Sequence, residues 1–108
     1  MRMRRSLKRK YALKRRITGR DAEGGYIESW GDPVMIEATI WQASGRIQAE
    51  MYGERLAYMR NMEYEGAETI SETDGICVFV SPDQNPDYCV VSVNADHKPV
   101  RYLLEVIR

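Results

Sequence analysis

Apolar and polar residues alternate along much of the chain with a period of two, which is typical of half-buried β-strands. In residues 11–18, for example, Tyr11, Leu13 and Ile17 share one face. Clusters of Gly, Pro, Asp and Asn interrupt the alternation, as turns require. The pattern predicts strands at residues 11–18, 26–30, 34–43, 56–65, 76–80, 88–94 and 100–107.

One segment departs from this period. Within residues 45–55, Ile47, Met51 and Arg55 are spaced at i, i+4 and i+8, which predicts a short helix with Ser44 as its N-cap. Six or seven short strands with one helix and frequent turns favour a small antiparallel barrel or sandwich. We expect a mainly β fold built on a small antiparallel β-barrel.

Charge divides the 108 residues unevenly, although the formal net charge is +0. Residues 1–20 contain ten Lys or Arg and no Asp or Glu, whereas residues 21–108 contain six basic and sixteen acidic residues. We therefore divide the chain into a basic N-terminal arm, residues 1–10, and a single β-barrel domain, residues 11–108. A domain of this size buries roughly two thirds of its unfolded surface, which is enough for a real core.

The two cysteines carry a structural expectation. No apolar run approaches the roughly 18 residues of a membrane span, and no apolar stretch follows the basic start as in a signal peptide. We therefore expect Cys77 and Cys89 to be reduced thiols. If residues 76–80 and 88–94 form a hairpin centred on Asp83, the two cysteines lie directly opposite each other. Two small buried hydrophobic side chains are favoured over a disulfide there.

Catalytic motifs are absent from the sequence. There is no P-loop, no GxGxxG, no HExxH and no CxxC. His97 is the only histidine and falls in an expected turn, so a histidine-based triad or metal site lacks ligands. We expect no catalytic residues, no metal and no cofactor, and thus not an enzyme.

Two charged groups are candidate contact surfaces. The basic group is a candidate partner-binding site, by docking on an acidic protein surface, by neutralising nucleic-acid phosphates, or as a solvated tail. Because the rest of the chain is acidic and would repel a duplex, we favour protein docking. The acidic group is expected to be a solvated face rather than a cation site. The basic group is Arg2, Arg4, Arg5, Lys8, Arg9, Lys10, Lys14, Arg15 and Arg16, and the acidic group is Glu63, Glu65, Glu68, Glu72 and Asp74.

The stretch from Ile17 to Arg46 resembles a known family. It combines a strand, the turn sequence DAEGG, a strand ending in Trp, a strand ending in Trp-Gln-Ala and a Ser-Gly-Arg helix start. This layout is similar to the head–tail joining, or head-closure (stopper), proteins of long-tailed bacteriophages, of the PBSX-like defective prophage type. The last two expected strands also look like those of the family. The residues that match are Asp21, Gly24, Gly25, Trp30, Trp41, Ser44 and Gly45.

The resemblance implies a structural role. Proteins of this family are small β-barrels that assemble as a ring beneath the phage portal and adaptor after DNA packaging. They close the DNA channel and present the surface to which the tail attaches. The resemblance thus implies a place at the virion head–tail interface, assembly in the bacterial cytoplasm, and portal, adaptor and tail proteins as partners.

In that family a segment between central strands projects into the channel as a plug. The corresponding segment here is residues 44–55, with the acidic loop 66–75 as a competitor. The candidate plug or ring-contact residues are Ser44, Gly45, Arg46, Gln48, Glu50, Met51, Glu54 and Arg55.

Two functional hypotheses follow. As a connector subunit, monomeric until it assembles, the chain would lay its basic arm on the acidic domain of the next copy or on the adaptor, and an acidic channel lining would let DNA slide. As an OB-like single-stranded nucleic-acid-binding domain, it would track phosphates with the segment from Arg2 to Arg16 while Trp30 or Trp41 stacks on bases.

Overall fold

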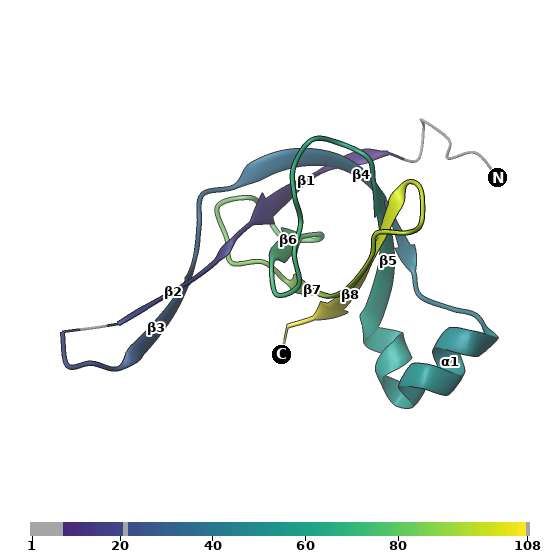
Figure 1. Cartoon of the computed structure of the whole chain (residues 1–108), viewed down its shortest axis with the longest axis horizontal. Helices are drawn as coiled ribbons and strands as arrows, with labels where there is room; N and C mark the ends of the chain where they lie inside the picture. Colours follow the sequence, from purple (N-terminus) through teal and green to yellow (C-terminus); the bar gives the residue numbers. More distant parts are fainter. Residues whose placement is uncertain (1–7, 21, 108) are drawn as a thin grey trace.

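A computed structural model of the protein describes residues 8–20 and 22–107. Six strands close into an antiparallel barrel in the order β1-β4-β5-β8-β7-β6, and β2 and β3 form a separate hairpin (Figure 1). This confirms the predicted mainly β fold, with a small antiparallel barrel and one short helical segment. The barrel strands are β1 (Arg9–Lys14), β4 (Val34–Gln42), β5 (Met59–Tyr64), β6 (Gly75–Cys77), β7 (Tyr88–Asn94) and β8 (Val100–Val106).

The hairpin of β2 (Arg16–Arg20) and β3 (Tyr26–Trp30) extends the β1–β4 ribbon beyond the barrel wall (Figure 1). The ribbon changes register at Arg15, whose carbonyl oxygen accepts a hydrogen bond from the Gly31 amide at 2.8 Å. The predicted single strand over residues 11–18 is therefore two strands. Leu13 is buried as predicted, but Ile17 is 48% exposed because it lies beyond the barrel.

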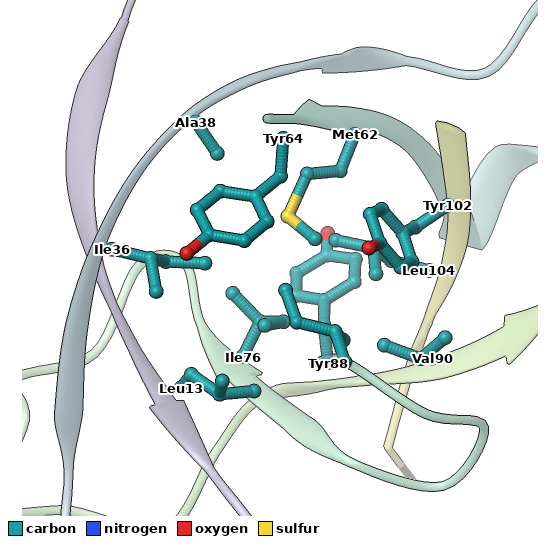
Figure 2. Close-up of a cluster of buried hydrophobic side chains, with 11 residues drawn as sticks. Leu13, Ile36, Ala38, Met62, Tyr64, Ile76, Tyr88, Val90, Tyr102 and Leu104 are labelled. Atoms are coloured by element: carbon teal, nitrogen blue, oxygen red, sulfur yellow. The ribbon is translucent and has the colours of Figure 1, made fainter. Parts of the chain in front are cut away.

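The core fills the barrel interior with side chains from all six strands (Figure 2). On β5 and β8 the alternation places Met62 and Leu104 inside, each fully buried. Burying side chains of this size contributes roughly 1.5–3 kcal/mol each. The core residues are Leu13, Ile36, Ala38, Met62, Tyr64, Ile70, Ile76, Tyr88, Val90, Tyr102 and Leu104.

A helical projection covers part of the outer wall of β5 and β8. It consists of the α-helix α1 (Arg46–Tyr52) and the 3-10 helix η2 (Gly53–Tyr58). Tyr52 and Leu56 pack against a second, smaller buried cluster of Ala43, Met59 and Leu103. Met59 of β5 and Leu103 of β8 therefore pack beneath a cover of their own, outside the barrel core.

Two predicted boundaries in this segment are wrong. The predicted helix over residues 45–55 ends as an α-helix at Tyr52, because Gly53 adopts a φ of 55° that breaks the helical path. Residues 56–58, predicted as strand, form the 3-10 turn instead. The expected N-cap at Ser44 is also wrong, because Gly45 occupies that position and no side chain caps the helix.

The predicted strand over residues 76–80 is shorter, since β6 ends at Cys77. The Asp87 carboxylate accepts hydrogen bonds from the Val78 and Phe79 amides at 2.7 and 3.0 Å, in place of a partner strand. These bonds turn the backbone out of the barrel wall and leave Phe79 69% exposed.

Candidate interaction surfaces

Arg15 fastens the base of the hairpin to the acidic loop, residues 66–75. Its Nη1 lies 2.8 Å from Asp74 Oδ2 and also donates to the Thr69 carbonyl, and its Nη2 lies 3.3 Å from Glu68 Oε2. Asp74 is 7% exposed, so its ion pair with Arg15 is shielded from water more than a surface pair is. Arg15 is thus shared between two carboxylates.

Arg16 forms the second contact at the hairpin base. Its Nε donates to the Thr73 carbonyl at 3.2 Å, and its guanidinium lies 4.5 Å from the centroid of the Trp30 ring. On Gly75, a Cβ would come within 2.9 Å of Trp30 and 2.5 Å of Pro86. A side chain on residue 75 would collide with both rings, so the Trp30 ring can pack against the barrel here only because this residue is glycine.

The acidic loop is held in an unusual backbone conformation at this point. Thr73 has a φ of 76°, which is rare for a β-branched residue. Its amide donates to the Val90 carbonyl at 2.8 Å, and the Asp74 carboxylate accepts from the Ser71 amide at 2.9 Å. We call the contacts of Arg15 and Arg16 with residues 68–74 the clasp.

The predicted basic site is largely engaged within the chain where the structure describes it. Lys8 Nζ lies 2.9 Å from Glu65 Oε1, and the buried Lys14 donates from Nζ to the Gln84 carbonyl at 2.7 Å. Arg9 and Lys10 are exposed residues of β1, so the barrel begins two residues earlier than predicted. The remaining predicted residues, Arg2, Arg4 and Arg5, lie outside the described residues.

The predicted acidic face is distributed over several ion pairs. Glu63 Oε2 lies 2.6 Å from Arg101 Nη2, whose guanidinium in turn lies 5.5 Å from the centroid of the Trp41 ring. Glu65, Glu68 and Asp74 pair with Lys8 or Arg15, as described above. Glu72 lies in the same loop and is exposed.

The predicted plug segment forms an outward-facing helix. No residue of α1 is buried, and Ile47 and Met51 are 73% and 66% exposed. A reciprocal amide pair fastens the helix to β5: Gln48 Nε2 donates to Asn61 Oδ1 at 3.0 Å, and Asn61 Nδ2 donates back to Gln48 Oε1 at 3.3 Å. The apolar spacing that predicts the helix therefore faces solvent rather than the core.

Charged contacts accompany this helical projection. Arg46 and Glu50 form an exposed i,i+4 pair at 3.7 Å. Arg55 binds both carboxylate oxygens of Glu105 on β8, at 2.7 and 3.0 Å. Ser44, Gly45 and Glu54 are exposed.

An aromatic and cationic pair at one end of the barrel is missing from the sequence predictions. Arg60 lies 4.9 Å from the centroid of the exposed Phe79 ring and donates from Nε to the Tyr88 hydroxyl at 3.3 Å. The Phe79 and Tyr88 rings are 6.1 Å apart. Residues 76–80 form an uninterrupted apolar run, so only Asp87, nine residues after Val78, could have signalled that Phe79 turns outward.

The expected pairing of the cysteines is wrong. Cys89 lies opposite Gly75, and Cys77 lies opposite Ala12 on β1, because β6 and β7 pair two residues out of the assumed register. Both thiols are free, and burial raises the pKa of each above its usual value. They are partly or fully buried small side chains, as the sequence favours.

Other chemistry is sparse in the part of the chain that the structure describes. His97 Nδ1 lies 2.7 Å from the Pro99 carbonyl oxygen and 3.8 Å from Glu63 Oε2. Across residues 8–20 and 22–107, no group of three or more His, Cys, Asp or Glu residues is placed to hold a metal ion. Among the same residues, no helix is both long and apolar enough to cross a membrane.

Comparisons with other proteins return no match, whether the chain is set against protein-family models, curated proteins or solved structures.

Proposed function

We propose that the protein is a structural virion subunit that joins the phage head to the tail and closes the DNA channel after packaging. In this proposal it is not an enzyme and needs no cofactor. Its partners are the portal, the adaptor, the tail proteins and further copies of itself in a ring. It acts at the head–tail interface of the virion and is assembled in the bacterial cytoplasm.

One observation carries the proposal. The segment that resembles the family's plug, residues 44–55, lies on a helical projection whose α-helix buries no residue and presents Ile47 and Met51 to solvent. Large exposed apolar side chains gathered on one element are typical of protein interaction sites. The small closed barrel, which holds its own core, supplies a rigid base for that element.

The test uses tailless, DNA-filled heads from a phage that lacks this protein. Purified wild-type chain is expected to join these heads, to stop DNA release and to permit tail attachment. Ile47→Ser together with Met51→Ser should reduce closure while the chain stays folded. Met35→Ser is the matched control, because Met35 on β4 is also exposed, at 52%, but lies outside the helical projection. Failure of the wild-type chain to join the heads would overturn the proposal.

The nucleic-acid-binding alternative has less support. Lys14, Arg15 and Arg16 are engaged with groups of the same chain, and a guanidinium lies on the rings of both Trp30 and Trp41. Phosphates and bases would therefore have to displace existing contacts. If the alternative holds, binding of single-stranded DNA should fall steeply with salt, in proportion to the phosphates contacted.

A further inference from the structure

Phe79 and Arg60 form a preorganised knob at one end of the barrel. Phe79 is the only phenylalanine of the chain and is 69% exposed. Its backbone is fixed by the hydrogen bonds to the Asp87 carboxylate, so docking this ring costs little conformational entropy. Ile107, 38% exposed, donates its amide to the carbonyl of the same Asp87 at 2.9 Å.

Arg60 gives the knob a positive charge that no carboxylate of the described residues neutralises. Its guanidinium contacts the Phe79 ring and the Tyr88 hydroxyl, and within residues 8–20 and 22–107 it pairs with no carboxylate. Aromatic residues, phenylalanine among them, and arginine are enriched at protein interfaces. The knob therefore fits an apolar pocket with a carboxylate at its rim.

Such a pocket lies at the other end of the same barrel. A groove of about 560 Å³ is lined by apolar and aromatic side chains, among them Tyr64, Val93 and Tyr102. Glu65 and Glu68 also line it, together with one cation, Lys98. The Tyr64 hydroxyl accepts a hydrogen bond from the Glu68 amide at 3.0 Å, which fixes this side of the groove.

Glu68 is the carboxylate that best complements Arg60. Its side chain is 44% exposed and lies 3.3 Å from Arg15, which makes its closer contact, 2.8 Å, with Asp74. One guanidinium serves two carboxylates, and it contacts Glu68 at Oε2. A second cation can therefore bind Glu68 without displacing the clasp.

The strand order puts the knob and the groove too far apart to meet within one copy. Tyr88 and Val106 are paired at the knob end of β7 and β8, whereas Asn94 and Arg101 are paired near the groove end. At about 3.3 Å per residue, the seven residues of β7 separate the two ends by roughly 20 Å. Contact between them requires two molecules.

We infer that the chain associates head to tail, with Phe79 and Arg60 of one copy seated in the groove of a second copy and Arg60 paired with Glu68. Such a contact joins two different surfaces, so it closes a ring or continues as a chain, depending on the rotation between copies. The inference deepens the proposed ring-forming function and rests on it for its biological meaning.

The test follows self-association of the full chain by sedimentation velocity and by 19F NMR of 4-fluorophenylalanine, which labels Phe79 alone. The wild-type chain should form larger species as its concentration rises, with a concentration-dependent shift of the single resonance. Phe79→Ala should weaken association about tenfold or more, as loss of an interface hot spot does. Met35→Ser, at an exposed position of β4 that belongs neither to the knob nor to the groove, should leave it unchanged. A wild-type chain that stays monomeric at millimolar concentration would overturn the inference.

Mixing two defective variants tests the head-to-tail geometry. Phe79→Ala removes the knob and keeps the groove, whereas Ala95→Trp fills the groove at an exposed turn position and keeps the knob. Each variant alone should be monomeric, and the mixture should form one-to-one dimers and nothing larger. Association of either variant with itself at wild-type strength contradicts the inference.

A charge exchange tests the pairing of Arg60 with Glu68. Arg60→Glu should weaken association, and Glu68→Arg in the same chain should restore it. Absence of restoration, while circular dichroism shows both variants folded, rejects this pairing. The head-joining assay separates this inference from the proposed function. If Phe79→Ala joins heads normally, the role of the knob is rejected and the proposed function is kept. If the wild-type chain self-associates but does not join heads, the proposed function is rejected and the head-to-tail contact is kept.

Discussion

Two elements project from the barrel, and they are fastened to it in different ways. The β2–β3 hairpin is held at its base by the clasp, in which Arg15 and Arg16 bind two carboxylates and backbone carbonyls of residues 68–74, and by the contact of Arg16 with the Trp30 ring. The helical projection is held by apolar packing of Tyr52 and Leu56, by the Gln48–Asn61 amide pair and by the ion pair of Arg55 with Glu105, and no residue of α1 is fully buried. The hairpin base is thus fastened to the barrel by charged contacts, whereas the outer face of α1, with Ile47 and Met51, is exposed to solvent.

This difference indicates where each element can change. Isolated two-stranded hairpins are marginally stable in water, so the hairpin depends on the contacts at its base. A short helix without buried residues can vary its outer face at little cost to folding. The exposed apolar residues of α1 are therefore available for a binding role.

Among the contacts that fasten the two projections, the clasp is expected to have the largest effect. Asp74→Ala removes the partner of Arg15 and the acceptor of the Ser71 amide, and should lower the free energy of unfolding by about 2–3 kcal/mol, as for hydrogen bonds to charged groups. Urea denaturation followed by tryptophan fluorescence measures it, because Trp30 lies at the hairpin base. Asp74→Asn keeps an acceptor for the Ser71 amide, so its free energy of unfolding should lie between those of the wild-type chain and Asp74→Ala.

Glu72→Ala is the control for Asp74→Ala. Glu72 lies in the same loop and is exposed, so its removal should change the free energy of unfolding by less than about 0.5 kcal/mol. Equal losses in the two variants would show that the clasp does not support the hairpin. The tryptophan fluorescence would then report unfolding of the barrel and not loss of the hairpin contacts.

The sequence predicts the barrel well because period-two alternation reports directly which side chains face a core. The strand segments around Met62 and Leu104 follow that rule, and their burial agrees. Where a side chain replaces a strand partner, as Asp87 does for Val78 and Phe79, local pattern carries no signal. The outward turn of Phe79 depends on a contact across a loop.

The candidate surfaces are less predictable for the same reason. The charge division along the chain is visible in the sequence, but the match of Arg15 with Asp74 joins residues 59 positions apart. The helix at α1 follows from the spacing of Ile47 and Met51, yet the same spacing is equally typical of a buried face. Only the position of the element beside the barrel decides that these residues are exposed.

An intermediate effect is expected at the attachment of α1. Gln48→Ala leaves the Asn61 amide, 7% exposed, without its partner, and should cost about 1–2 kcal/mol of unfolding free energy. Changing both residues to leucine removes the need for the pair and should recover most of that loss. Thermal unfolding by circular dichroism compares the variants. If the double variant is as unstable as Gln48→Ala, the amide pair itself stabilises the attachment of α1, and the loss does not come only from leaving the Asn61 amide without a hydrogen-bond partner.

The smallest expected effect is at the outer face of α1, where, unlike at the base of the hairpin, side chains can change without loss of stability. Ile47→Ser and Met51→Ser should each change the free energy of unfolding by less than about 0.5 kcal/mol, because neither side chain loses contact with a core. Met59→Ser, one of the few fully buried side chains beneath the same projection, should cost several kcal/mol, in the range of about 2–5 for deletions of large buried side chains. Denaturant titration of the three variants makes the comparison. If the two helix variants destabilise the chain like Met59→Ser, the outer face of α1 is part of the fold and is not free to bind. If they do not, a selective loss of head closure in the same variants is attributable to binding, because folding no longer offers an explanation.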